Sequence, residues 1–374
     1  MPDQTVHGTV IIDANEPIKA RNVTLQVVGQ AHTHWKCKHM STYYNPETKT
    51  TEVNRGIVKE SESHPARGIE TYMDNKFVLW DGSDKKMLPA GIHKLNFVFP
   101  LPHTCPPSYE GEFGYIRYYC KAKIDRPWQF DKTVIAGFTV LPHFDLNTIP
   151  HAANPRASIP KYGYVPGESI DIQMDFLNES SRKIDCIDVK LIEYTIYTGK
   201  CDYTSHRARK EHDRTVNQIK HHSKIQAKTS GSEILSLKVP PIVPSFHNCS
   251  IIQVDYILKV NVDAHGFMNN TMSFNLPILI GTYPIIPRAI ESPAYPMAPP
   301  DYVAPPQSTV PPEAIFGPPP SYAICKFGQG TVALYDKDAK NAENFGFAPR
   351  YLYYNSGIAN SYPALPELSA STQL

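Results

Sequence analysis

The feature that most limits the fold of this chain is an alternation of apolar and polar side chains along much of its length. It is clearest over residues 252–263, where every second residue is apolar and only Ile257 is apolar on the opposite side. A period of two places the two sets of side chains on opposite faces of an extended strand. The segment predicts a strand with one buried and one hydrated face, and shorter runs at 95–99, 116–124 and 170–176 repeat the pattern.

Further strand-like runs follow one another at short intervals and are bounded by turn residues. They lie at residues 23–28, 134–140, 185–197, 234–239 and 272–280. Many short strands without a helical period are typical of antiparallel sandwiches. The chain has 374 residues, enough for two domains that each bury a core. We therefore predict an all-β protein built from two antiparallel, immunoglobulin-like sandwiches.

A short internal repeat marks the start of each predicted sandwich. Residues 166–170 (Pro-Gly-Glu-Ser-Ile) and residues 2–6 (Pro-Asp-Gln-Thr-Val) share a proline turn, two further turn or polar residues, a hydroxyl residue and a β-branched residue. Residues 157–165, before the second copy, are expected to form an edge strand. Only Met1 precedes the first copy, so we expect the first sandwich to lack its opening strand.

The strand pattern ends after Ile280, and a proline-rich tail begins. Residues 284–320 contain 13 prolines and almost no alternation. Such a segment cannot bury enough apolar surface to offset the entropy of ordering it. We divide the chain into a first sandwich at 1–142, a second sandwich at 157–284 and a disordered tail at 285–374.

Two Pro-Pro-x-Tyr motifs lie 20 residues apart in this tail. Paired prolines favour a polyproline II helix, which WW domains bind in an aromatic groove with a pocket for the tyrosine. A flexible link of this length spans roughly 25 Å, so two WW domains can bind together. The alternative is a spacer rich in proline and tyrosine. The predicted WW-binding residues are Pro299, Pro300, Tyr302, Pro319, Pro320 and Tyr322.

A third copy of the motif, at residues 106–109, lies within the first predicted sandwich. A WW groove needs an extended and detached peptide, which a packed loop cannot supply. We expect this copy to be a structural turn and Tyr109 to be at least partly buried.

A polar connection at residues 199–232 carries eight basic and three acidic residues. Such a segment can contact acidic cargo tails, phosphorylated sites or anionic lipid. The alternative is a solvated hairpin with no partner. The candidate contact residues are Arg207, Arg209, Lys210 and Arg214.

Composition and motifs argue against several other classes of function. A formal net charge of +1 gives no field for nucleic acid or anionic membranes. The N-terminus has no secretory signal, and no apolar run reaches the length of a membrane-spanning helix. Seven dispersed cysteines without a C-x-x-C pair favour reduced thiols in the cytosol.

No residues suggest a metal site, a cofactor or catalysis. On a strand, His32 and His34 share one face, whereas Cys37 and His39 share the other, so these four side chains do not close a tetrahedral site. Nucleotide-binding and nucleophile motifs are missing. We predict no metal, no cofactor and no enzyme activity.

Three stretches resemble the α-arrestins, the arrestin-domain-containing proteins. Residues 88–128 are similar to the N-domain signature of this family, and residues 164–184, 240–263 and 276–284 to its C-domain. The resemblance implies two seven-stranded β-sandwiches side by side. It also implies a trafficking adaptor in the cytoplasm, at the plasma membrane and at endosomes. Its partners would be HECT-type ubiquitin ligases with WW domains and the cytoplasmic regions of membrane-protein cargo, which is then ubiquitinated and endocytosed.

Two alternatives remain open. One is a non-catalytic coat or scaffold subunit, like the arrestin-like subunit of retromer, which needs no Pro-Pro-x-Tyr pair. The other is a signalling regulator. One branch of the family, the thioredoxin-interacting protein, uses a cysteine in the loop that corresponds to residues 228–231. No cysteine is present there, so thioredoxin binding is disfavoured.

Overall fold

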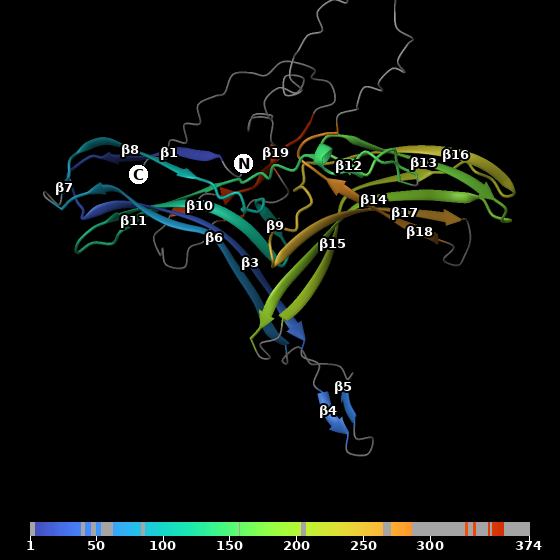
Figure 1. Cartoon of the computed structure of the whole chain (residues 1–374), viewed down its shortest axis with the longest axis horizontal. Coiled ribbons are helices and arrows are strands. Elements are labelled where there is room, and N and C mark those ends of the chain that lie inside the picture. The colour runs from blue at the N-terminus through green and yellow to red at the C-terminus, as the bar shows by residue number, and fades with distance from the viewer. Residues whose placement is uncertain are drawn as a thin grey trace, which may run out of the picture.

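The computed structural model describes twelve segments of the chain. They are residues 4–38, 42–45, 50–53, 63–83, 87–156, 158–202, 207–264, 271–285, 326–327, 332–333, 343–344 and 346–354. Apart from a single 3-10 turn at Leu146–Thr148, every regular element in these segments is a strand. The prediction of an all-β fold with two sandwiches side by side is confirmed (Figure 1). In the same segments, no helix has the length and apolar character needed to span a membrane.

The first sandwich, here called the N-lobe, contains strands β1 to β11. One layer pairs β1 (Thr5–Ala14) with β8 (Gly91–Pro100), antiparallel from Thr5 opposite Pro100 to Ala14 opposite Gly91. In the other layer, β3 (Asn22–Lys38) lies between β6 (Ser63–Asp81) and β10 (Gly114–Asp125), and β11 (Lys132–Phe138) follows β10. The remaining short strands are β2 (Ile18–Lys19), β4 (Thr42–Asn45), β5 (Thr50–Val53), β7 (Met87–Leu88) and β9 (Tyr109–Gly111).

The second sandwich, the C-lobe, contains strands β12 to β18. One layer pairs β13 (Ser169–Asn178) with β16 (Thr229–Lys238). The other layer runs through β12 (Gly163–Tyr164), β18 (Thr271–Ile280), β17 (Ile252–Ala264), β14 (Ile184–Cys201) and β15 (Arg207–His222). Strand β17 buries the apolar residues of its alternating pattern, as predicted: Ile252, Val254, Tyr256, Leu258, Val260 and Val262.

The two strands that begin with the internal repeat occupy matching places. Within the described residues, β1 pairs only with β8 and β13 only with β16. The edge strand predicted at residues 157–165 is shorter than expected: of the described residues there, Gly163–Tyr164 form a strand, which lies at the end of the sheet and runs parallel to β18. The reason is a tight turn in which Arg156 and Ile159 hydrogen-bond to each other. The expectation that the first sandwich lacks its opening strand stays a prediction.

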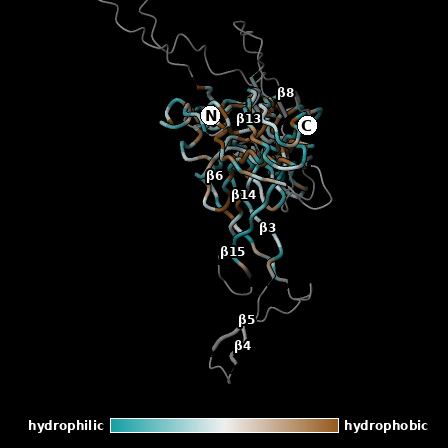
Figure 2. Tube along the Cα trace, turned by 90° about the vertical axis from the view of Figure 1, so that its right-hand side faces the viewer, coloured by the Kyte–Doolittle hydropathy of each residue, from teal (hydrophilic) through white to brown (hydrophobic). Residues whose placement is uncertain are grey.

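The two lobes are joined through their long strands. Residues Lys200 and Cys201 of β14 pair with Arg67 and Ala66 of β6, which makes one sheet continuous across the junction. The hairpins β3–β6 and β14–β15 extend together out of the body (Figures 1 and 2). We call this projection the stem: residues 30–38, 63–70, 194–201 and 207–213. Most buried apolar side chains form one cluster through both lobes, and Leu146, Ala152 and Val165 form a smaller second one.

Part of the tail packs on the body, contrary to the prediction that residues 285–374 are disordered. The short strands are β19 (Lys326–Phe327), β20 (Val332–Ala333), β21 (Glu343–Asn344), β22 (Gly346–Phe347) and β23 (Arg350–Tyr351). Tyr351, Leu352 and Tyr353 are buried, because this short apolar run has enough surface to pack even though the proline-rich stretch before it has little. The backbone N–H of Tyr354 donates to the carbonyl of Pro166 over 2.9 Å. Gly167 has a φ of 99°, and a Cβ there would collide with the Tyr354 backbone.

Candidate functional site

The predicted WW-binding residues lie outside the described residues. Pro299, Pro300, Tyr302, Pro319, Pro320 and Tyr322 therefore keep their predicted role on the sequence alone. The segment that holds them is fixed at both ends. Thr282 ends the second sandwich, and the hydroxyl of Tyr354 donates to the Thr282 carbonyl over 2.7 Å. Between these two residues, β21 pairs with β11 of the N-lobe, so the chain also contacts the body there before it reaches Thr282 again.

The four basic candidates on β15 do not form a single patch. Arg207 donates to the carbonyl of Ser250 over 3.2 Å, and Arg209 forms an exposed ion pair with Glu211 at 3.0 Å. Lys210 lies over the ring of Phe113, 5.0 Å from its centroid. Arg214 is turned towards the junction. Because alternate residues of a strand point to opposite faces, the sequence cluster is divided between two faces. Contact of any of them with a partner stays a prediction.

The third motif, at residues 106–109, is buried at the junction of the lobes, as predicted. Tyr109 is 2 % exposed. The hydroxyl of Tyr118 donates to the Pro106 carbonyl over 2.7 Å. Ser108 and Val140 are joined by two hydrogen bonds of 2.9 Å, in which each backbone N–H donates to the other residue. These contacts hold the segment in the fold and leave no detached peptide for a WW groove.

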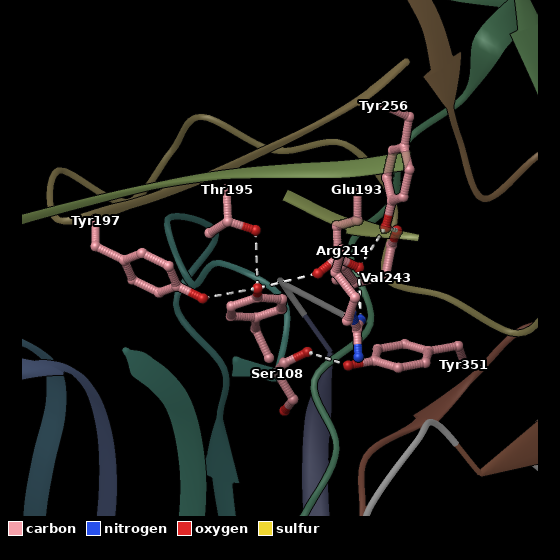
Figure 3. Close-up of polar contacts among 9 residues, drawn as sticks. Ser108, Glu193, Thr195, Tyr197, Arg214, Val243, Tyr256 and Tyr351 are labelled. Carbon is pink, nitrogen blue, oxygen red and sulfur yellow. Dashed lines mark hydrogen bonds and ion pairs between the residues drawn. The ribbon is translucent and has the colours of Figure 1, made fainter. Parts of the chain in front are cut away.

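A polar cluster surrounds the buried hydroxyl of Tyr109. Its partners Glu193, Thr195 and Tyr197 are labelled in Figure 3. This hydroxyl donates to Oε1 of Glu193 over 3.1 Å, and it lies 2.9 Å from the hydroxyl of Thr195 and 3.1 Å from that of Tyr197. Tyr109 comes from the N-lobe, whereas the other three residues come from β14 of the C-lobe. A Cβ on Gly111 would collide with the hydroxyls of both tyrosines. The cluster therefore ties the two lobes together through side chains.

Glu193 carries the negative charge of this cluster. Its side chain is 2 % exposed, and its Oε2 accepts from Nη2 of Arg214 over 2.7 Å. Glu193 and Arg214 lie directly opposite each other on β14 and β15. Burial alone would lower the pKa of Arg214, but the Glu193 carboxylate outweighs burial and raises it. A buried carboxylate requires such a partner, because desolvating an unpaired charge costs several kcal/mol.

Two further tyrosines close the cluster (Figure 3). The hydroxyl of Tyr256 donates to the Val243 carbonyl over 2.7 Å and lies 3.3 Å from Oε2 of Glu193. The hydroxyl of Tyr351, from the tail, donates to the carbonyl of Ser108 over 3.2 Å. Burial raises the pKa of Tyr109, Tyr256 and Tyr351 well above its ordinary value, and Glu193 raises it further. The hydroxyls therefore remain protonated donors.

The space left within the cluster is small. Side chains of the two lobes and of the tail line a partly open pocket of about 20 Å³, room for one water molecule. Beside it, Arg117 and Glu110 form a two-pronged ion pair at 2.7 and 2.9 Å, with both side chains largely buried. Every charge in this region thus has an internal partner. The arrangement holds the lobes and the tail together and presents no activated nucleophile.

The sequence-based metal candidates are not brought together. His32 stacks on Tyr115 with ring centroids 5.1 Å apart, and Cys37 lies against Cys201. His39 lies outside the described residues. In the part of the chain that the structure describes, no group of three or more histidine, cysteine or acidic side chains can hold a metal ion.

Sequence reasoning missed Glu193, Tyr256 and Tyr351 as members of a site. A signal for Glu193 was present, because it continues the buried register of Ile187, Val189 and Leu191 along β14. A carboxylate in the apolar register of a strand predicts a buried charge with a partner. Tyr351 offers no such signal, since it lies far along the chain from every residue it contacts.

Comparison with known proteins identifies the class to which this fold belongs. The family model described as "Arrestin (or S-antigen), N-terminal domain" matches residues 1–147, and the corresponding C-terminal domain model matches residues 152–285. The chain belongs to the arrestin family. The resemblance to α-arrestins is confirmed.

The relatives are arrestin-domain-containing proteins. Arrestin domain-containing protein 17 of Caenorhabditis elegans is 30% identical over 305 residues, which cover 75% of this chain and 67% of that protein. Human arrestin domain-containing protein 4 is 27% identical over 308 residues, 75% of this chain and 68% of that one. Rat arrestin domain-containing protein 1 is 28% identical over 260 residues, which cover 62% of this chain and 58% of that protein.

Proposed function

We propose that this protein is a trafficking adaptor that recruits HECT-type ubiquitin ligases to membrane-protein cargo. The two lobes bind the cytoplasmic region of the cargo, and the tail binds the WW domains of the ligase. The cargo is then ubiquitinated and endocytosed. The adaptor itself performs no catalysis, and it acts in the cytoplasm, at the plasma membrane and at endosomes. Membership of the arrestin family supports the adaptor role.

The observation that carries the ligase step is the pair of Pro-Pro-x-Tyr motifs at residues 299–302 and 319–322. Both lie beyond the second sandwich, whereas the copy at residues 106–109 is buried and hydrogen-bonded. The two motifs lie between Thr282 of the C-lobe and β21, which pairs with β11 of the N-lobe. A ligase bound to this segment stays close to whatever the lobes bind, which raises its effective concentration at the cargo.

Calorimetry with single and tandem WW domains tests the proposal. Each motif is expected to bind one WW domain by itself, and a tandem WW protein is expected to bind roughly 100-fold more tightly. Tyr302→Ala or Tyr322→Ala reduces tandem binding to about the level of one site, and the double variant abolishes it. Phosphorylation of either tyrosine has the same effect as its single substitution by alanine, because a doubly charged group cannot enter an apolar pocket at low cost.

Tyr295→Ala is the matched control, since Tyr295 is a tail tyrosine without the Pro-Pro-x-Tyr context. It should bind like the wild type. If the double variant keeps wild-type affinity for tandem WW domains, ligase recruitment through these motifs is refuted. The coat or scaffold function then becomes the better proposal. A pulldown of the same variants from cells, analysed by mass spectrometry, identifies ligase and cargo in one experiment.

A further inference from the structure

Two cysteines from different lobes meet in the stem. Cys37 is on β3 of the N-lobe and Cys201 is on β14 of the C-lobe, and their sulfur atoms are 2.9 Å apart. They are separated by 164 residues in the chain. Cys201 is 6 % exposed, whereas Cys37 is partly exposed. One thiol is therefore accessible from solvent, and the other lies directly behind it.

The pairing of the strands explains why the two thiols meet. β6 lies beside both β3 and β14, with His64 opposite Cys37 and Ala66 opposite Cys201. Ala66 is small and fully buried. Cys37 also lies within hydrogen-bond distance of the His64 carbonyl, at 3.1 Å. Its side chain is thus held towards Cys201.

We propose that Cys37 and Cys201 are a redox modification site, at which a peroxide closes a reversible disulfide between the two lobes. An S–S bond measures about 2.05 Å, so the two sulfur atoms need to approach by less than about 1 Å. This inference goes beyond the adaptor function and does not depend on it. It also differs from the thioredoxin-binding cysteine of the family branch discussed above, which has no counterpart at residues 228–231.

The chemistry balances with hydrogen peroxide as the two-electron oxidant. The thiolate of Cys37 attacks one peroxide oxygen, the O–O bond breaks, and a sulfenic acid and one water form. The sulfur of Cys201 then attacks the sulfur of Cys37, the S–O bond breaks, and the second water leaves. Two thiols and one peroxide become one disulfide and two waters. A dithiol reductant returns two electrons and two protons to reverse the reaction.

The surroundings of the pair keep it reduced until an oxidant persists. Burial and the neighbouring Cys201 raise the pKa of Cys37 to about 11, and Asp202 adds to this shift. Little thiolate is present at neutral pH, so the first step is slow. The second step is fast, because the two sulfur atoms are already in contact. The site therefore responds to sustained oxidation rather than to brief exposure.

Peptide mapping of the full chain tests this proposal without any substitution. The protein is treated with hydrogen peroxide at low protein concentration, the remaining thiols are alkylated, and the chain is digested without reductant. We expect a peptide that joins Cys37 to Cys201, lighter by two hydrogen atoms and cleaved by dithiothreitol. Alkylation of both thiols after peroxide treatment, or irreversible oxidation of Cys37 with Cys201 still alkylated, overturns the proposal.

Thermal unfolding provides a second measurement. A cross-link that closes so long a loop should raise the melting temperature of the oxidised protein by roughly 5 °C or more. Cys37→Ser and Cys201→Ala remove this increase, while their reduced forms fold. Cys186→Ser, at the other end of β14, is the matched control and keeps both the cross-link and the increase. Equal melting temperatures for reduced and oxidised wild type refute a cross-link between the lobes.

Discussion

Two of the side-chain contacts that join the lobes have opposite physical character. At the junction, Glu193 and Arg214 form an ion pair whose carboxylate is buried and surrounded by hydroxyl donors. In the stem, Cys37 and Cys201 are neutral thiols, and one of them is partly exposed. The first contact is costly to break, because desolvated charge cannot be left unpaired. The contact between the two thiols contributes little to stability while both are reduced, but oxidation can turn it into a covalent bond.

The largest effect is expected from Tyr109→Ala at the junction. The substitution removes a buried ring and the hydrogen bonds that its hydroxyl makes with Glu193, Thr195 and Tyr197. We expect a loss of about 4 kcal/mol in the free energy of unfolding, measured in urea. WW-domain affinity of the folded fraction should not change, because the motifs at residues 299–302 and 319–322 are intact. Lower WW affinity with an unchanged melting temperature would show that residues 106–109 bind the ligase.

Arg214→Met is expected to have the next largest effect. It keeps the aliphatic length but leaves the Glu193 carboxylate buried without a cation, at a cost of about 3 kcal/mol. The control is Arg209→Met, because Arg209 and Glu211 are both more than half exposed and their pair contributes at most about 1 kcal/mol. The double variant Glu193→Gln/Arg214→Met should recover part of the loss. If Arg214→Met and Arg209→Met lower the free energy of unfolding by the same amount, the distinction between buried and exposed ion pairs is contradicted.

Tyr351→Phe tests the tail contact of the junction more gently. It keeps the buried ring and removes only the hydroxyl that donates to the Ser108 carbonyl. A neutral hydrogen bond of this kind contributes about 1 kcal/mol. Tyr354→Phe removes the corresponding contact to Thr282 and is the natural comparison. If limited proteolysis cuts residues 346–354 as readily in the wild type as in these variants, the tail does not hold the body in solution.

The smallest effect concerns the pH dependence of the stem. The pKa of Cys37 is about 11 in the folded protein against a reference of 9.0, so the folded state disfavours the thiolate. Its contribution to stability is complete below pH 9 and is lost as the pH rises towards 11. Because Cys37 is partly exposed, we expect wild type to lose only about 1 kcal/mol relative to Cys37→Ser over this range. Urea unfolding under reducing conditions measures the difference, and parallel curves for the two proteins would contradict it.

The features that could be predicted from the sequence are those set by residues close to one another along the chain. The alternation over residues 252–263 became β17 with its apolar side chains buried, because a period of two separates the faces of any strand. The burial of Tyr109 followed from its position between two predicted strands. The tail was predicted from composition, and the prediction failed at Tyr351–Tyr353, where a short apolar run lies within a polar segment.

The pairing of Glu193 with Arg214 depends on the register of two strands, which the pattern alone leaves open. A bulge between Leu191 and Ile192 shifts the pairing of β14 with β15 and places the two charges opposite each other. Arg207, Arg209, Lys210 and Arg214 are near neighbours in sequence, yet the strand directs them to different faces. Their proximity in sequence suggested one shared surface, but alternate residues of a strand point to opposite faces of the sheet.

By itself, the sequence determined the all-β class, the two sandwiches, the buried turn at residues 106–109 and the tandem motifs of the tail. Each depends on local backbone preference or on side-chain periodicity, which operate over a few residues. Only the tertiary structure decided that Tyr109, Glu193 and Tyr351 share one cluster and that Cys37 touches Cys201. These contacts join segments that are far apart in the chain, and they form only when the packing of two lobes sets strand register and removes water from the junction.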